Sequence, residues 1–96
     1  MNDLPIPGFL EAIRAAHGAK AKLLARENLR ETFRGDLVWE GEVLIFGLQD
    51  HPTASICYAW EVDGEVTAVV AEGPVESAED AVRGSIMAQM VRKYRP

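Results

Sequence analysis

The sequence contains no lysine or arginine between Gly35 and Val82, although this stretch holds eleven of the fifteen carboxylates in the chain. Residues 1–34 carry six bases and four acids, and residues 83–96 carry four bases and no acid, so the three segments have formal charges of +2, −11 and +4. A surface that serves only solubility normally intersperses both signs. The segregated charge therefore predicts an electrostatic recognition surface, with plain solubility as the alternative.

Cysteine and histidine are scarce. The single cysteine, Cys57, excludes an internal disulfide, and neither His17 nor His51 has a second ligand beside it at metal spacing. We expect Cys57 to be a small buried hydrophobe, His17 to lie on a helix surface or half-buried, and His51, which precedes Pro52, to shape a turn. The sequence therefore predicts no metal and no cofactor.

Enzyme motifs are missing as well. The chain has no glycine-rich phosphate loop, no serine in a nucleophile elbow and no base implied beside Cys57. Neighbouring carboxylates occur at Glu40 and Glu42, and at Glu61, Asp63 and Glu65. They fall at predicted strand edges and turns, where water solvates them. We therefore expect no enzymatic activity and no small-molecule substrate.

Composition bounds the class of protein. The 96 residues are 48% apolar and 26% charged, which is enough to fill one modest core, so we expect a single domain over residues 1–96. No apolar run approaches the roughly 20 residues that cross a bilayer, and Met1 to Pro5 lack the features of a signal peptide. The net charge of −5 disfavours direct binding to nucleic acid or anionic lipid. We expect a cytoplasmic protein without membrane contact.

The first third of the chain predicts a helix over about residues 8–27. Pro5 and Pro7 indicate an extended lead-in, with Pro7 as a candidate first helical residue. Apolar residues then recur at helical spacing, at Phe9, Leu10, Ile13, Ala16, Leu23 and Leu24. Gly18 predicts a bend or break in this helix.

Residues 29–33 fit either a short strand or a continued helix, and we favour the strand. A continued helix would align four bases at four-residue spacing as a basic ridge, which predicts weak nucleic-acid binding. These bases are Lys22, Arg26, Arg30 and Arg34. A solvated face is the simpler interpretation, because Glu27 and Glu31 dilute the ridge.

Strand-forming residues fill 37–48, 54–62 and 65–71, with a turn over 49–52. Gly41 predicts a bulge or a close backbone approach. Asp63-Gly64 predicts a two-residue hairpin whose register places Val62 opposite Glu65 and Trp60 opposite Thr67. One face of this hairpin then carries Ile56, Tyr58 and Trp60, and the other carries Cys57, Ala59, Val66, Ala68 and Val70.

The end of the chain predicts a second helix. Ser77 and Asp80 form a capping box, and Gly84 is expected to permit close packing. The helix carries an apolar stripe and basic residues near its end, namely Val82, Ile86, Met87, Met90, Val91 and Tyr94, then Arg92, Lys93 and Arg95. The predicted fold is α+β: an antiparallel sheet of three or four strands with an N-terminal helix, and a C-terminal helix on the sheet face of smaller residues.

Several stretches together resemble small proteins of phages and prophages. They are Val38-Trp39-Glu40-Gly41-Glu42-Val43, Phe46, His51-Pro52-Thr53-Ala54, Tyr58-Ala59-Trp60, Gly73-Pro74-Val75, Ser77, Asp80-Ala81-Val82-Arg83 and Ile86. The resemblance covers about half the chain, from Val38 to Ile86, and brings no activity or site with it. It implies a phage-encoded accessory protein. In size, acidity and lack of catalytic residues the chain is also similar to anti-CRISPR proteins.

The expected function is inhibition by binding. Carboxylates would mimic nucleic acid and dock on a basic groove of a host defence complex, such as a CRISPR effector, while aromatic residues anchor the contact. The expected partner-binding residues are Glu40, Glu42, Tyr58, Trp60, Glu61, Asp63 and Glu65. Self-association through the apolar sheet face, giving a structural or regulatory homodimer, is the alternative.

Overall fold

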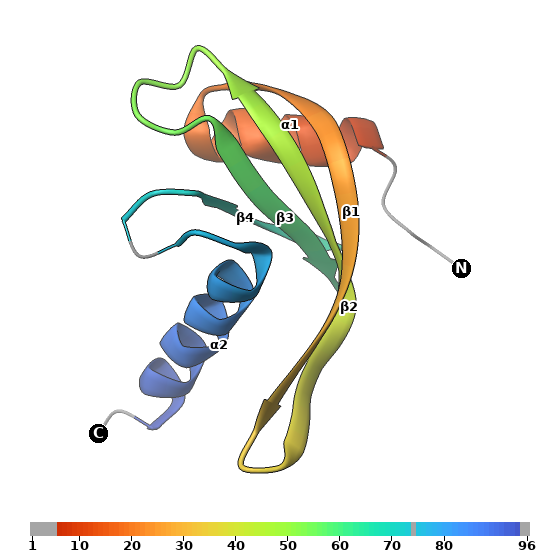
Figure 1. The fold of residues 1–96 in the computed structure, drawn as a ribbon, viewed down its shortest axis with the longest axis vertical. Helices are drawn as coiled ribbons and strands as arrows, with labels where there is room; N and C mark the ends of the chain where they lie inside the picture. The colour runs from red at the N-terminus through yellow and green to blue at the C-terminus, as the bar shows by residue number, and fades with distance from the viewer. Residues whose placement is uncertain (1–5, 74, 95–96) are drawn as a thin grey trace.

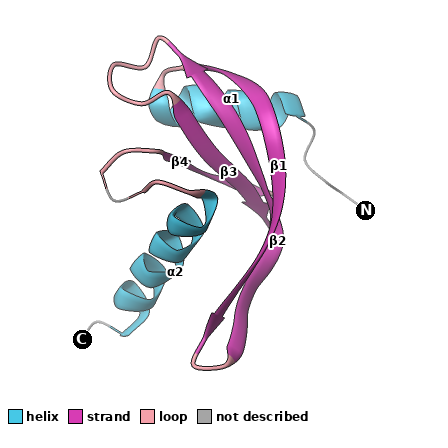
Figure 2. Ribbon diagram, viewed as in Figure 1, coloured by secondary structure: helices cyan, strands magenta, loops and turns pink. Residues whose placement is uncertain are grey.

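The computed structural model describes residues 6–73 and 75–94, and of residues 89–94 it describes only the helical backbone. The elements in chain order are α1 Ile6–His17, β1 Lys20–Phe33, β2 Asp36–Gln49, β3 Ile56–Val62, β4 Glu65–Val70 and α2 Ala78–Tyr94. The strands form one antiparallel sheet in the order β1-β2-β3-β4 (Figures 1 and 2). The predicted α+β fold with a helix at each end is confirmed.

The predicted helix over residues 8–27 is wrong in its second half. Gly18 has a φ of +66° and its N–H donates to Arg14 O at 2.8 Å, so it ends α1 as a left-handed cap. Lys20–Phe33 is one long strand, because its pairing with β2 outweighs the helix propensity of its Ala, Lys, Leu and Arg residues. Helix α1 begins at Ile6, so Pro7 lies in its first turn, while residues 1–5 are outside the described part.

Strands β1 and β2 form a long hairpin closed by Arg34-Gly35, both with positive φ, with Phe33 opposite Asp36. The β1 register shifts between Leu23 and Ala25, so the alternation of its side chains reverses there. Strand β2 pairs with β3 only over residues 44–47. The far half of the β1–β2 hairpin, residues 27–43, is therefore a two-stranded ribbon that extends beyond the four-stranded part (Figure 1).

The predicted hairpin at Asp63-Gly64 is confirmed, with φ values of +53° and +84° at these residues. Val62 faces Glu65 and Trp60 faces Thr67, as the two-residue loop requires. Gly41 is not at a bulge, but the predicted close approach is present. A Cβ on Gly41 would lie 2.8 Å from Cζ2 of Trp39.

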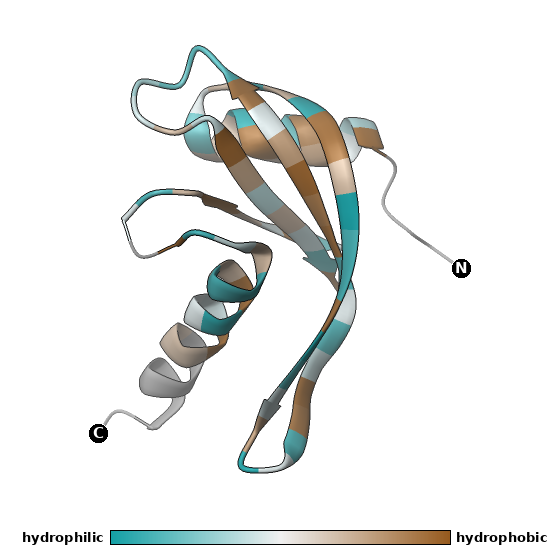
Figure 3. Ribbon diagram, in the orientation of Figure 1, coloured by the Kyte–Doolittle hydropathy of each residue, from teal (hydrophilic) through white to brown (hydrophobic). Residues whose placement is uncertain are grey.

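The two helices cover opposite faces of the sheet. Helix α1 packs on the face of smaller residues through Phe9 and Ile13, whose neighbours there are Leu44, Phe46, Cys57 and Ala59. Helix α2 packs on the other face, where Ala78, Ala81 and Val82 meet Leu29, Val43, Tyr58 and Trp60. The prediction that α2 covers the small-residue face is wrong, because α1 already occupies that face. In Figure 3 the apolar bands of the sheet concentrate where it crosses α1.

Helix α2 starts at the predicted cap. Asp80 N donates to Oγ of Ser77 at 3.1 Å, and the Asp80 carboxylate accepts from Glu76 N at 3.1 Å, one residue before the cap. Gly84 does not permit close packing, since a Cβ there would meet nothing within 4 Å. The predicted positions Met90, Val91, Arg92, Lys93, Tyr94 and Arg95 have side chains outside the described set.

An ion pair ties α2 to the far half of β1. Glu31 is only 8% exposed, and its Oε1 accepts from Arg83 of α2 at 3.2 Å. Arg83 also lies 3.7 Å from Glu79, one turn earlier on the same helix.

Within residues 6–73 and 75–94, no helix has both the length and the apolar character needed to span a bilayer.

Candidate partner-binding groove

The seven residues expected to bind a partner do not form one surface. Alternation along β2 and β3 places Glu40, Glu42 and Glu61 on the sheet face that α1 covers in part. Glu65 pairs with Val62 and shares the opposite face with Trp60, and Asp63 lies in the turn between β3 and β4. The sheet therefore divides the predicted acidic surface in two.

Two of these acids are already paired within the chain. Glu42 Oε1 lies 3.1 Å from Arg26, and Glu40 Oε2 lies 2.9 Å from Arg30. All four side chains are exposed, so each pair stabilises the fold by at most about 1 kcal/mol, but it cancels local charge.

The four bases of the predicted basic ridge do not share one face. The register shift between Leu23 and Ala25 puts Lys22 on the opposite face from Arg26, and Arg34 lies in the hairpin turn over the ring of Phe33. The nucleic-acid alternative depended on a basic N-terminal helix, but Lys22, Arg26 and Arg30 lie in strand β1.

The two aromatic anchors are core residues. Tyr58 is 7% exposed and Trp60 is 4% exposed, because α2 lies over their face of the sheet. The Tyr58 hydroxyl donates to Glu76 O at 3.4 Å. Burial, with the nearby carboxylates of Asp80 and Glu27, raises the pKa of Tyr58 above its ordinary value of 10.0. Their burial leaves little of either ring accessible to a partner.

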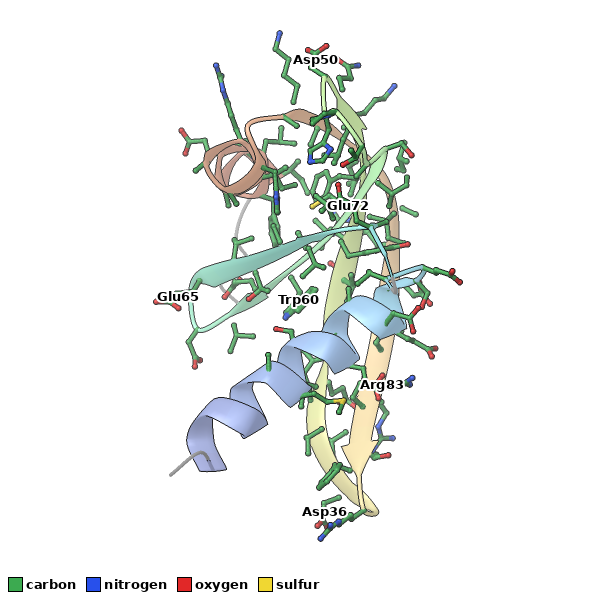
Figure 4. All side chains as sticks on the ribbon, turned by 90° about the vertical axis from the view of Figure 1, so that its left-hand side faces the viewer. Asp36, Asp50, Trp60, Glu65, Glu72 and Arg83 are labelled. Atoms are coloured by element: carbon green, nitrogen blue, oxygen red, sulfur yellow. The ribbon has the colours of Figure 1, made fainter. Side chains whose placement is uncertain are left out.

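Trp60 nevertheless borders an open groove of about 680 Å³. The groove lies between the far half of β2, the β3–β4 hairpin and α2, and Figure 4 shows Trp60 between the hairpin and the helix. Its walls are formed by Val38, Trp39, Trp60, Val62, Asp63, Glu65, Thr67, Val82, Ser85 and Ile86. Three predicted partner-binding residues, Trp60, Asp63 and Glu65, therefore meet here.

An aromatic pair forms part of the groove. The rings of Trp39 and Trp60 have centroids 6.2 Å apart and planes at 61°, an edge-to-face arrangement. Trp39 is half-buried, so part of its ring remains accessible. Gly41 leaves the space for that ring, because any larger side chain on this face would meet it.

The rim of the groove is acidic. Asp63 and Glu65 are exposed, and none of the ion pairs among the described residues involves either of them. Glu61 lies on the other face and accepts from Gly64 N at 2.9 Å, which supports the turn. Figure 4 shows Glu65 at the tip of the hairpin. No lysine or arginine is among the described residues that line the groove.

Cys57 lies outside the groove, in the core under α1, and is fully buried. Burial raises the pKa of its thiol to about 11, against a smaller opposing effect of a backbone hydrogen bond from Val69. At neutral pH the thiol is protonated, which is the state of a structural cysteine rather than a nucleophile.

The fold brings the two histidines together, which their spacing in the sequence did not indicate. Their ring centroids are 6.4 Å apart. His17 Nε2–H donates to Ala68 O at 3.0 Å, and His51 Nδ1 accepts from the backbone N–H groups of Thr53 and Ala54 at 3.2 and 2.9 Å. These bonds give His51 the predicted turn role. The part of the chain that is described contains no group of three or more His, Cys, Asp or Glu able to hold a metal ion.

Sequence reasoning missed the walls of the groove that come from β2 and α2, namely Val38, Trp39, Val82, Ser85 and Ile86. Trp39 followed two residues later by Gly41 is a local signal for an accessible ring, since both share one strand face. The contribution of α2 has no local signal, because it depends on which face the helix covers.

No protein-family model, curated protein or solved structure matches the chain.

Proposed function

We propose that this protein acts by binding another protein in the groove between β2, the β3–β4 hairpin and α2. The observation that carries the proposal is the combination of two tryptophans, two exposed carboxylates and no described base around one hollow. Tryptophans are enriched among the residues that dominate binding energy, and a surface of one charge steers and selects a partner of the other charge.

Binding is favoured over turnover by where the candidate chemical groups lie. Asp63 and Glu65 are exposed at a hairpin tip, where water can solvate both carboxylates. The Cys57 thiol is buried and protonated. The groove thus offers shape and charge to a ligand and lacks an activated nucleophile among its described residues.

The partner that fits is a protein with a basic surface. A host defence complex whose nucleic-acid groove is rich in lysine and arginine has this chemistry, and inhibition of such a complex in the bacterial cytoplasm, in the manner of an anti-CRISPR protein, is the setting we propose. Glu40 and Glu42 are exposed but pair with Arg30 and Arg26, so they offer little unpaired negative charge to such a contact. Docking would then centre on Asp63 and Glu65.

Co-purification from a bacterial host tests this proposal. Ser85 lines the groove on α2, so Ser85→Tyr should fill it, whereas Ala88→Tyr adds the same side chain at an exposed position of the same helix. We expect Ser85→Tyr to lose the protein that co-purifies with the wild type and Ala88→Tyr to retain it. Retention by both variants, with circular dichroism showing intact folds, would show that the partner binds elsewhere.

A second candidate, self-association, is favoured by exposed apolar side chains near the free end of the ribbon. Phe33, Leu37 and Met87 are 49%, 49% and 59% exposed. Phe33 and Met87 border a second hollow of about 270 Å³ between the ribbon and α2. Sedimentation equilibrium should show a concentration-dependent dimer that Phe33→Ser abolishes. A monomer at all concentrations would eliminate this candidate.

A further inference from the structure

We propose that the groove receives an arginine side chain of the partner, with its guanidinium against the tryptophan pair and between the carboxylates of the rim. This inference rests on the proposed binding function and specifies the chemical group that the groove recognises. The occupant is a protein segment, because the phosphates of a nucleic acid would be repelled by Asp63 and Glu65.

The charges of the groove favour a cation. Asp63 and Glu65 are the ionisable groups among its described walls, and both are acidic residues. Neither takes part in an ion pair within the described residues, so neither has to release a partner before it binds a ligand. A bound cation would thus gain attraction without breaking an internal contact.

The remaining walls suit a long side chain with an apolar stem. Val38, Val62 and Ile86 supply aliphatic surface, and Trp39 supplies accessible aromatic surface. A cation over a tryptophan ring is attracted by the electron density of its face. Arginine buries its methylene stem against apolar groups while its head remains near charge, and the groove provides for both parts.

The distances along the sheet are consistent with one side chain reaching both ends. Trp60 pairs with Thr67, and the next pair on the same face is Val62 with Glu65. One such step along a strand is about 7 Å, at roughly 3.4 Å per residue. A guanidinium that lies between these two pairs can therefore contact the tryptophan pair and the Glu65 carboxylate together, with its methylene stem beside Val62.

Arginine suits this site better than lysine. Its guanidinium is planar, stacks on aromatic rings and donates two parallel hydrogen bonds to a carboxylate. The lysine ammonium is a compact and strongly hydrated charge, so it loses more hydration on entering a groove lined with apolar side chains.

The two tryptophans provide a probe of the site, because the chain contains only two and both line the groove. The ligands are acetylated and amidated tetrapeptides of the form Gly-Arg-Val-Gly, with arginine replaced in turn by citrulline, lysine or norleucine. We expect the arginine peptide to change tryptophan fluorescence and shift both indole N–H resonances. Citrulline has the same shape without charge and should weaken binding about tenfold, which corresponds to the loss of one charge-assisted hydrogen bond.

Two variants assign the effect to the rim. Glu65→Gln removes the carboxylate that faces the groove, and Glu42→Gln makes the same change on the opposite face of the sheet. We expect Glu65→Gln to weaken the arginine peptide several-fold and to reduce its salt dependence, and Glu42→Gln to have no effect. Equal binding of the arginine, citrulline and norleucine peptides, or no shift of either indole resonance, would overturn the inference.

The inference and the proposed function can fail separately. If Ser85→Tyr abolishes partner binding while Glu65→Gln and the citrulline substitution leave binding unchanged, the groove binds a protein through apolar groups and the arginine inference is wrong. If the partner remains bound to Ser85→Tyr, the proposed function itself is wrong, whatever the peptides show.

Discussion

Substituting Gly41 by alanine tests the aromatic pair on which the proposed site depends. The new Cβ would lie 2.8 Å from Cζ2 and 3.1 Å from Cη2 of Trp39, so the ring has to move. Movement breaks its edge-to-face contact with Trp60, and such contacts contribute about 0.5–1.5 kcal/mol. The loss is opposed by the smaller conformational entropy of an unfolded chain with alanine, worth about 0.4–1 kcal/mol.

Gly47→Ala is a matched control that separates these two effects. Gly47 lies on the same strand and the same face, and its Cβ would meet Cδ1 of Leu24 at 3.2 Å. Leu24 is 56% exposed and can turn away, so this variant keeps the entropic gain without disturbing the tryptophans. The difference between the two variants therefore isolates the ring contact, at about 1 kcal/mol or 4–8 °C in melting temperature for a domain of this size.

Thermal unfolding followed by far-ultraviolet circular dichroism gives the two melting temperatures. Near-ultraviolet circular dichroism reports the packing of the tryptophans in the folded state. We expect Gly41→Ala to melt below Gly47→Ala, to change the tryptophan spectrum and to bind the arginine peptide less tightly. Equal melting temperatures together with an unchanged tryptophan spectrum would refute the contact between Gly41 and the Trp39 ring.

Three further predictions concern stability. Gly64→Val should lower the free energy of unfolding in urea by about 1 kcal/mol or more, because a β-branched residue resists a φ of +84°, and an unchanged midpoint would contradict the turn. Arg83→Leu should cost about 1–2 kcal/mol by leaving the buried Glu31 unpaired, whereas Glu79→Ala, at the exposed end of the same network, should cost under about 0.5 kcal/mol, and equal costs would contradict the buried pair. The Cys57 thiol has a pKa of about 11 in the folded protein against an ordinary 9.0, so the unfolded chain loses this proton at lower pH. The free energy of unfolding should therefore be unaffected by this group below pH 9 and should fall by up to about 2 kcal/mol as pH rises to 11. The free energy of unfolding of Cys57→Ala should fall less steeply over the same pH range.

Local signals explain what the sequence predicted correctly. Asp63-Gly64 specifies its hairpin because few residue pairs accept positive φ at two successive positions, and the two-residue loop then determines which residues pair across β3 and β4. Ser77 likewise specifies the start of α2 through its hydrogen bond to Asp80 N. Each of these features depends on residues within a few positions of one another.

Features determined by distant residues were not predictable in this way. Residues 20–27 have helix-forming composition, and they form a strand only because β2 pairs with them. The burial of Trp60 depends on which helix covers its face, and the alternation of residues along β3 does not contain that information. The division of the acidic residues could be inferred in part, since the hairpin register already placed Glu65 beside Trp60 and Glu61 on the other face.

The ribbon formed by the far half of β1 and β2 has a consequence for the kinetics of recognition. Over residues 36–43, strand β2 pairs with β1 and not with β3. A two-stranded ribbon of this kind is marginally stable without further support. The support comes from α2 through the Glu31–Arg83 pair and the packing of Trp39 on Trp60. Backbone amides of residues 37–41 should then exchange with deuterium faster than those of residues 44–47, because opening the ribbon does not require unfolding the four-stranded part. Since Val38 and Trp39 form one wall of the groove, the groove would widen with each opening, and a bound ligand would slow exchange along the whole ribbon.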